Sequence, residues 1–199
     1  MFANRYTALI DACVLVSAAK RDLILSLAHA EMFRFRWTDR IMAETETALT
    51  AIFSERLGSQ KDAASRATHS CKAMCEAFPE AMIEGNFSDV PAYDGVPDKN
   101  DHHIIHAAVL GKASMIVTDN LKHFPEDALR PHDIEVRSAD AFIADAIDLD
   151  RIRAAEAVKA LRARLINPTV TAQDLLDRWE QHHGLVETVR LLRDYQGLI

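Results

Sequence analysis

The 199-residue sequence has no long apolar run, few cysteines and no surplus of basic residues. A membrane helix needs about 20 consecutive apolar residues, so we predict no membrane span. Three cysteines are a small and odd number, which excludes a disulfide framework and is typical of the reducing cytoplasm. Glycine and proline number six each, too few for a linker or low-complexity sequence.

The charge is distributed unevenly along the chain. The net charge of -7 has the wrong sign for a protein that coats nucleic acid nonspecifically. From Arg151 onward there are eight basic and six acidic residues, which leaves -9 on residues 1–150. The negative charge therefore lies in the part of the chain where an acidic metal site would have to be.

Short apolar strands alternate with helices over the first three quarters of the chain. The patterns predict strands at 6–11, 33–37, 81–83, 114–118 and 134–137, helices at 18–31, 39–57, 60–78 and 98–110, and a loop at 86–97. Residues 7–19 resemble the apolar part of a signal peptide, but Asp11 in their middle favours a core strand. This alternation predicts an α/β fold with an open parallel sheet and helices on both faces.

The end of the chain is helical in pattern. Helices are predicted at 139–147, 151–166, 171–183 and after Gly184. The apolar face at Leu175, Leu176 and Trp179 could pack on the body, form a dimer interface or receive a protein partner. We predict two domains, residues 1–148 and a C-terminal helical extension at 149–199.

Two aspartates follow buried strands directly. Asp11 ends the strand at 6–11, and Asp119 follows the strand at 114–118. Ligands bind at the carboxyl edge of open parallel sheets, so both positions suit a site. Each aspartate could instead only form a turn with its own backbone.

Glu44, Asp98 and Asp101 are acidic residues at the start of helices or on an apolar face. Glu44 lies on the same face as Ile41, so it needs a partner, either a metal ion or an arginine such as Arg34 or Arg36. Asp98 suits a helix N-cap. Asp101 suits the helix dipole but also lies on the apolar stripe of its helix. Carboxylates that converge raise one another's pKa unless a divalent cation compensates, and oxygen ligands suit Mg²⁺ or Mn²⁺.

Four segments resemble those of PIN-domain nucleases, namely LIDACVLVSA, IMAETETAL, PDKNDHHIIHAA and IVTDNLKHFP, within residues 6–145. The resemblance implies that Asp11, Glu44, Asp101 and Asp119 hold one or two Mg²⁺ or Mn²⁺ ions that activate water for phosphodiester hydrolysis. Asp98 would be an additional ligand, and Thr118 and Asn120 would hold the ligands by hydrogen bonds. The family often has Asn where this chain has Cys13, a departure expected to weaken one such contact.

The resemblance extends to the VapC toxins, which implies a cytoplasmic endoribonuclease with an RNA substrate, a small antitoxin as partner and a homodimer as a frequent form. One alternative is a catalytically silent PIN-fold protein that binds nucleic acid or acts as a scaffold. Another alternative is a receiver domain, which accepts a phosphate group on an aspartate. The position of Glu44 on a helix does not match the acidic site of such a domain.

Several basic residues and histidines have two interpretations. Arg34, Arg36, Arg40 and Lys122 could bind RNA phosphates or form ordinary surface ion pairs. His102, His103 and His106 lack a third ligand at zinc spacing, so we expect a solvated helix face. Cys71 and Cys75 share an apolar stripe and are expected in the core.

Overall fold

The computed structural model describes residues 7–85, 87 and 89–199. Tyr6 of the first predicted strand, and Asn86 and Ser88 of the predicted loop, lie outside this set. The described residues form two compact units. We call them the sheet unit (residues 7–16 and 35–136) and the helical unit (residues 17–34 and 137–199). This grouping differs from the two predicted domains, 1–148 and 149–199, whose limits stay a prediction.

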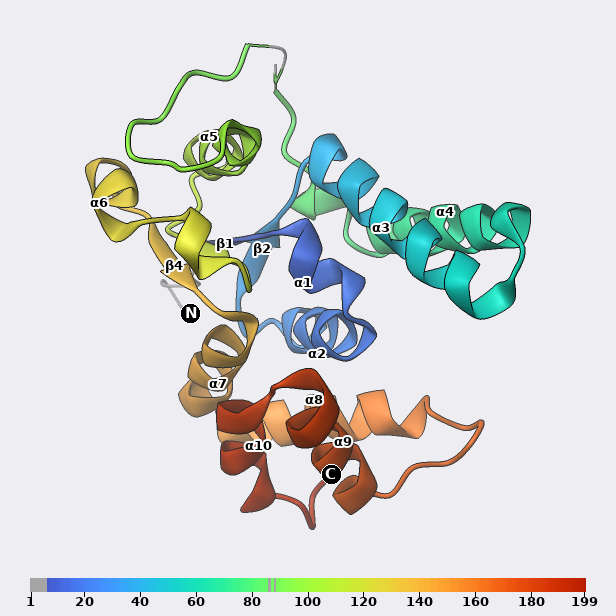
Figure 1. Cartoon of the computed structure of the whole chain (residues 1–199). Helices are drawn as coiled ribbons and strands as arrows, with labels where there is room; N and C mark the ends of the chain where they lie inside the picture. Colours follow the sequence, from blue (N-terminus) through green and yellow to red (C-terminus); the bar gives the residue numbers. More distant parts are fainter. Residues whose placement is uncertain (1–6, 86, 88) are drawn as a thin grey trace. The chain divides into compact units, whose positions relative to one another are not determined.

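The described strands form one sheet in the order β2-β1-β3-β4. They are β1 (Thr7–Ile10), β2 (Arg34–Arg36), β3 (Met115–Val117) and β4 (Glu135–Arg137). The two central strands run parallel, with Ala8 opposite Met115 and Ile10 opposite Val117. Every residue of β3 is buried, as the continuous apolar pattern of a central parallel strand predicts. This is the predicted α/β fold, in which helices connect the strands (Figure 1).

The sheet unit holds most of the connecting helices. They are α1 (Ala12–Val16), α3 (Asp39–Leu57), α4 (Gln60–Ala77), η1 (Pro79–Ala81), η2 (Lys99–Asp101), α5 (His102–Leu110), η3 (Leu121–His123), α6 (Glu126–Leu129) and η4 (Arg130–His132). α5 packs on β1 and β3, and α3 packs on α4 and α1. Side chains of α5 therefore lie against the two central strands.

Local signals explain where α3 begins and ends. Thr38 accepts a hydrogen bond from the Ile41 main-chain N–H, so it satisfies a donor that the first turn leaves unpaired. Gly58 ends the helix in the left-handed region, at a φ of 66° that other residues rarely adopt. Both limits agree with the prediction, and they fix the register that places Glu44.

Three predictions about the sheet unit are wrong in detail. Residues 12–16, part of the apolar run at 7–19 interpreted from sequence as a core strand, form α1, because the chain turns at the sheet edge just after Asp11. Residues 81–83 contribute only one bridge, between Met82 and Trp37, after the 3-10 turn η1. The helix predicted at 98–110 begins with the 3-10 turn η2, which Asp98 caps by accepting from the Asn100 N–H.

The helical unit comprises α2 (Ala18–His29), α7 (Ala139–Leu149), α8 (Arg151–Ala163), α9 (Ala172–His183) and α10 (Val186–Arg193). Asp140 accepts hydrogen bonds from the main-chain N–H groups of Glu187 and Thr188, both at 2.9 Å, and so caps the start of α10. Leu175, Leu176 and Trp179 are buried, so the amphipathic face predicted there packs within the chain. No helix in the described part of the chain is long and apolar enough to span a membrane.

Candidate metal centre

The carboxyl ends of β1 and β3 bring Asp11 and Asp119 to one edge of the sheet. The register that pairs Ile10 with Val117 continues, since the Asp11 N–H donates to the Val117 carbonyl at 3.0 Å. Asp11 is half-buried and Asp119 is exposed. This edge is where open parallel sheets bind ligands.

Thr118 and Cys13 hold the Asp11 carboxylate from two sides. The fully buried Thr118 hydroxyl donates to Asp11 Oδ2 at 2.6 Å, and Cys13 Sγ donates to the same oxygen at 3.1 Å. Cys13 Sγ also accepts from the Asp119 N–H at 3.4 Å, while the Asn120 N–H donates to Thr118 Oγ1 at 3.0 Å. The two strand ends are therefore joined through one thiol and one hydroxyl.

Cys13 was expected to weaken a contact, but it makes one. Partial burial of its sulfur and the negative charge of Asp11 raise the pKa of the Cys13 thiol to about 12, although much of the residue is exposed. The thiol therefore keeps its proton at neutral pH and can donate it to the carboxylate. Sequence reasoning missed this role because a cysteine in an apolar run is usually core.

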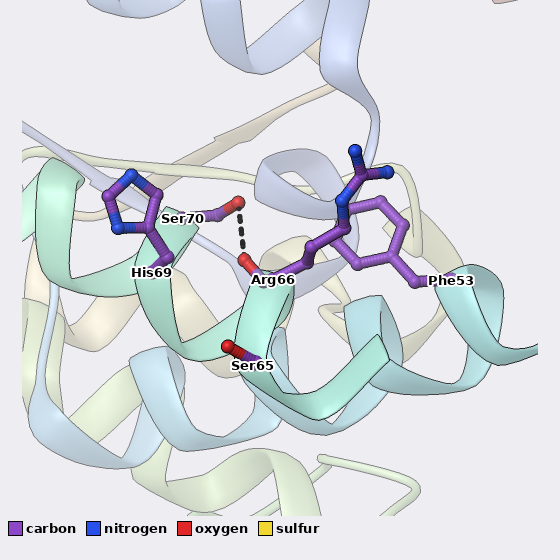
Figure 2. A pocket seen from close by; sticks show the side chains of 5 residues that line it. All are labelled: Phe53, Ser65, Arg66, His69 and Ser70. Atoms are coloured by element: carbon purple, nitrogen blue, oxygen red, sulfur yellow. Dashed lines mark hydrogen bonds between the residues drawn. The ribbon is translucent and has the colours of Figure 1, made fainter. Parts of the chain in front are cut away.

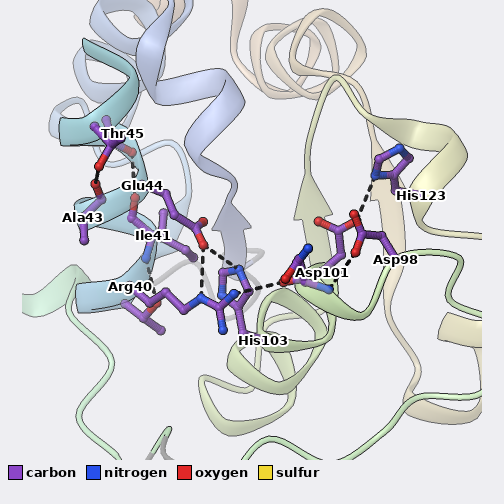
Figure 3. A network of polar contacts seen from close by, with 12 residues as sticks. Arg40, Ile41, Ala43, Glu44, Thr45, Asp98, Asp101, His103 and His123 are labelled. Atoms are coloured by element: carbon purple, nitrogen blue, oxygen red, sulfur yellow. Dashed lines mark hydrogen bonds and ion pairs between the residues drawn. The ribbon is translucent and has the colours of Figure 1, made fainter. Parts of the chain in front are cut away.

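Glu44 is held by Arg40 and His103. Arg40 Nε and His103 Nε2 each lie 3.1 Å from Glu44 Oε1, and neither Arg34 nor Arg36, the arginines first considered, is the partner (Figure 3). Burial opposes ionisation of Glu44, but the hydrogen bonds and charges of His103 and Arg40 outweigh it and lower the pKa of its carboxyl group. With its side chain 40% exposed, Glu44 is an ionised group that solvent and ions can reach.

Asp98, Asp101 and His123 form a compact cluster on the other side of the same network. One ligand atom from each lies within 4.8 Å of the others, and His123 Nδ1 is 2.8 Å from Asp101 Oδ2. Figure 3 shows the three side chains pointing toward one another. Arg40 Nη2 donates to the Asn100 carbonyl of η2 at 3.3 Å, which links this cluster to the Glu44 pair.

The structure brings together part of the predicted ligand set. Among the residues it describes, the group close enough to share one ion joins Asp98 and Asp101 with His123, for which the sequence did not predict a ligand role. The group leaves out Asp11, Glu44 and Asp119. The strand-end pair and Glu44 lie in the same unit as this cluster. Their role as ligands stays a prediction.

The donor chemistry of the cluster fits a divalent cation. Two carboxylates face a single imidazole, so the group is negative even when His123 is protonated. No lysine or arginine in the described part of the chain forms an ion pair with Asp98 or Asp101. A divalent ion would supply the missing positive charge and bind the carboxylate oxygens that Mg²⁺ and Mn²⁺ prefer.

The histidines at the start of α5 are buried, contrary to the solvated face expected for them. His102 and His103 are 8% and 4% exposed. His102 Nδ1 accepts from the Tyr93 N–H at 3.2 Å, and His106 Nδ1 lies 3.2 Å from the Tyr93 hydroxyl. The first two turns of α5 therefore fasten the loop before it and, through His103, position Glu44.

The four basic residues considered for RNA differ in what they already bind. Arg36 donates to the main-chain carbonyl of Glu80 at 2.7 Å, and Arg40 pairs with Glu44. Lys122 and Arg34 are exposed, Lys122 on η3 and Arg34 in the helical unit. Lys122 is thus an exposed cation that directly precedes His123 of the acidic cluster in the sequence.

A separate pocket of about 430 Å³ lies between α3 and α4. It is lined by Phe53, Ser65, Arg66, His69 and Ser70 (Figure 2). Phe53 follows Glu44 by nine residues, which at 100° per residue is about 180° round the helix. The pocket thus opens on the side of α3 away from the acidic residues.

Comparison with known proteins identifies the family of the chain. The PIN domain family matches residues 7–122, more than half of the chain, and a second family, the VapC50 C-terminal domain, matches residues 139–194. The chain therefore belongs to the PIN domain family.

A curated relative gives a more particular likeness. The chain is 40% identical over 77 residues to the "Putative ribonuclease VapC50" of Mycobacterium tuberculosis (strain ATCC 25618 / H37Rv). The matched stretch is 39% of this chain and 46% of the relative, so the chain spans less than half of that protein. No solved structure matches the chain.

Proposed function

We propose that this chain is a divalent-metal-dependent endoribonuclease that hydrolyses RNA phosphodiester bonds. The ligands of Mg²⁺ or Mn²⁺ are Asp11, Glu44, Asp98, Asp101 and Asp119. The observation that carries the proposal is the cluster of Asp98, Asp101 and His123 in a PIN-domain chain, with Asp11 and Asp119 following the two paired central strands. The ribonuclease name of the VapC50 relative supports it.

The chemistry divides between the ion and the residues around it. A bound divalent ion lowers the pKa of a water molecule and neutralises charge on the scissile phosphate. Thr118 and Cys13 fix the Asp11 oxygen, and Arg40 and His103 fix Glu44. These hydrogen bonds set the carboxylates in place before substrate arrives, which is how neighbours of metal ligands contribute to affinity and rate.

RNA would reach the acidic edge past basic side chains. A polyanion needs cations near a carboxylate site, and Arg34, Arg36, Arg40 and Lys122 are the candidates. Lys122 is exposed on η3, one residue before His123. We therefore place the phosphate next to the scissile one near Lys122.

The biological role we propose is the toxin of a bacterial toxin–antitoxin pair acting in the cytoplasm. A small antitoxin would bind the toxin and block the acidic edge, and the toxin would form a homodimer. The match of residues 139–194 to the VapC50 C-terminal domain supports this role, because it extends the likeness beyond the nuclease domain.

The function is tested by RNA cleavage with the purified chain. With Mn²⁺ or Mg²⁺ present, cleavage is expected, and excess EDTA is expected to reduce it to the background without enzyme. Readdition of Mn²⁺ should restore it. The Asp119→Asn protein, purified identically, serves as the control for contaminating nuclease. Equal inertness of both proteins on several RNAs would favour the silent scaffold instead.

Replacing Cys13 by Ala is expected to lower metal-dependent cleavage about 10-fold to 100-fold, the usual range for residues that hold a metal ligand. The change removes the donor to Asp11 Oδ2 and the acceptor of the Asp119 N–H. Cys13→Ser, which keeps a donor, should recover part of the rate. Cys75→Ala is the matched control on α4, and an unchanged rate in Cys13→Ala would refute the positioning role.

A further inference from the structure

We propose that His123 is a metal ligand, and that the site it forms with Asp98 and Asp101 prefers first-row transition ions such as Mn²⁺ and Co²⁺ to Mg²⁺. This inference rests on the proposed function, since Asp98 and Asp101 are two of the metal ligands proposed there. It adds a nitrogen donor to a set otherwise made of carboxylates, and with it a choice among metals.

Two 3-10 turns position the three donors: η2 positions Asp98 and Asp101, and η3 positions His123. Asp98 precedes η2 and is fixed by the hydrogen bond from the Asn100 N–H to its Oδ1 at 2.9 Å. Asp101 ends η2, and His123 ends η3, two turns that follow the loop and β3 respectively. Asp98 and Asp101 therefore share one turn, and the fold brings His123, 22 residues beyond Asp101, to within 4.8 Å of both ligand atoms.

The cluster is sheltered enough for its donors to be held in place. The side chains of Asp101 and His123 are 22% and 27% exposed. Two carboxylates in such surroundings repel each other, and the one imidazole offsets at most one of their two charges. A divalent cation supplies enough positive charge to balance both carboxylates. An Asp101–His123 ion pair alone leaves the negative charge of Asp98 uncompensated.

The chemical types of the donor atoms determine which cation the site prefers. Mg²⁺ prefers an octahedron of oxygens and keeps several waters, while imidazole nitrogen binds first-row transition ions well. Affinity of a mixed nitrogen and oxygen site rises from Mn²⁺ to Co²⁺ in the usual order for divalent ions. One imidazole with two carboxylates also leaves coordination positions for water and a phosphate oxygen.

The test is calorimetric titration of the full chain with Mn²⁺, Co²⁺ or Mg²⁺ at pH 8, where an ordinary histidine is neutral. In His123→Ala we expect the Co²⁺ and Mn²⁺ affinities to fall by about tenfold or more, while the Mg²⁺ affinity stays within about twofold. Retained Mg²⁺ binding shows in the same sample that the carboxylates are still in place. His69→Ala, which removes an exposed histidine of α4, is the matched control.

A second variant replaces the nitrogen donor by an oxygen donor. His123→Asp makes the site all oxygen, so the ratio of Co²⁺ to Mg²⁺ affinity should fall below that of the wild type. Unchanged Co²⁺ affinity in His123→Ala overturns the inference, and the His123–Asp101 contact is then an ion pair only. If Asp101→Asn alone loses binding, the proposed nuclease site stands with oxygen ligands. If Asp101→Asn also binds like wild type, the proposed ligand role falls with the inference.

Discussion

Asp101→Asn is expected to reduce metal-dependent RNA cleavage about a thousand-fold. Asp101 belongs both to the ligand set predicted from sequence and to the cluster found in the structure. An ion at such a site stabilises the transition state by several kcal/mol, and about 1.4 kcal/mol corresponds to a factor of ten in rate. The amide of asparagine keeps the size of the carboxylate and removes its charge, so the loss reports on ion binding. Single-turnover cleavage over a range of Mn²⁺ concentrations measures it.

The matched control for this variant is Asp62→Asn. Asp62 is an exposed residue in the first turn of α4. Asp101 has a similar position, in the turn η2 that leads into α5. Both changes remove the same favourable interaction with a helix N-terminus, which contributes only about 0.3–1 kcal/mol. If the two variants cleave equally well, Asp101 serves its helix and not an ion.

The fold and the strand-end acids could be predicted from sequence because they depend on local patterns. Continuous apolar residues mark β1 and β3, and an aspartate lies one residue after β1 and two residues after β3. Thr38 and Gly58 mark the limits of α3 by hydrogen-bond and φ requirements that are readable in one sequence. Parallel pairing then places Asp11 and Asp119 at one edge without any further information.

The remaining details depend on tertiary contacts. The apolar residues of α1 have no helical period in so short a segment, so sequence alone favours a strand. The polar side chains of His102 and His103 predict a solvated helix face from sequence. In the fold, the loop at Tyr93 contacts His102 and the Glu44 carboxylate contacts His103, and both side chains are buried. His123 lies on a 3-10 turn that no periodicity predicts, and its closeness to Asp101 follows from the course of the chain after β3.

Trp37→Ala is expected to lower the free energy of unfolding by about 3–5 kcal/mol, the usual cost of removing a buried aromatic side chain. Trp37 is fully buried, and its ring meets Phe35 edge-on at 4.9 Å between centroids. Its main chain also bonds to Ala81 and Ile83, and it directly precedes Thr38, the N-cap of α3. A cavity here would loosen the start of the helix that carries Glu44. Urea unfolding followed by circular dichroism measures the change.

Trp37→Phe separates loss of packing from loss of the indole nitrogen. The Trp37 Nε1 atom is buried and has no hydrogen-bond partner among the described residues, so the folded state gains nothing from this donor. Phenylalanine removes the unsatisfied N–H and keeps most of the apolar volume. The two effects oppose each other, and the free energy of unfolding should change by less than about 1.5 kcal/mol. A loss as large as that of Trp37→Ala would mean that the indole N–H is bonded in solution and that this donor, and not the cavity, dominates the cost.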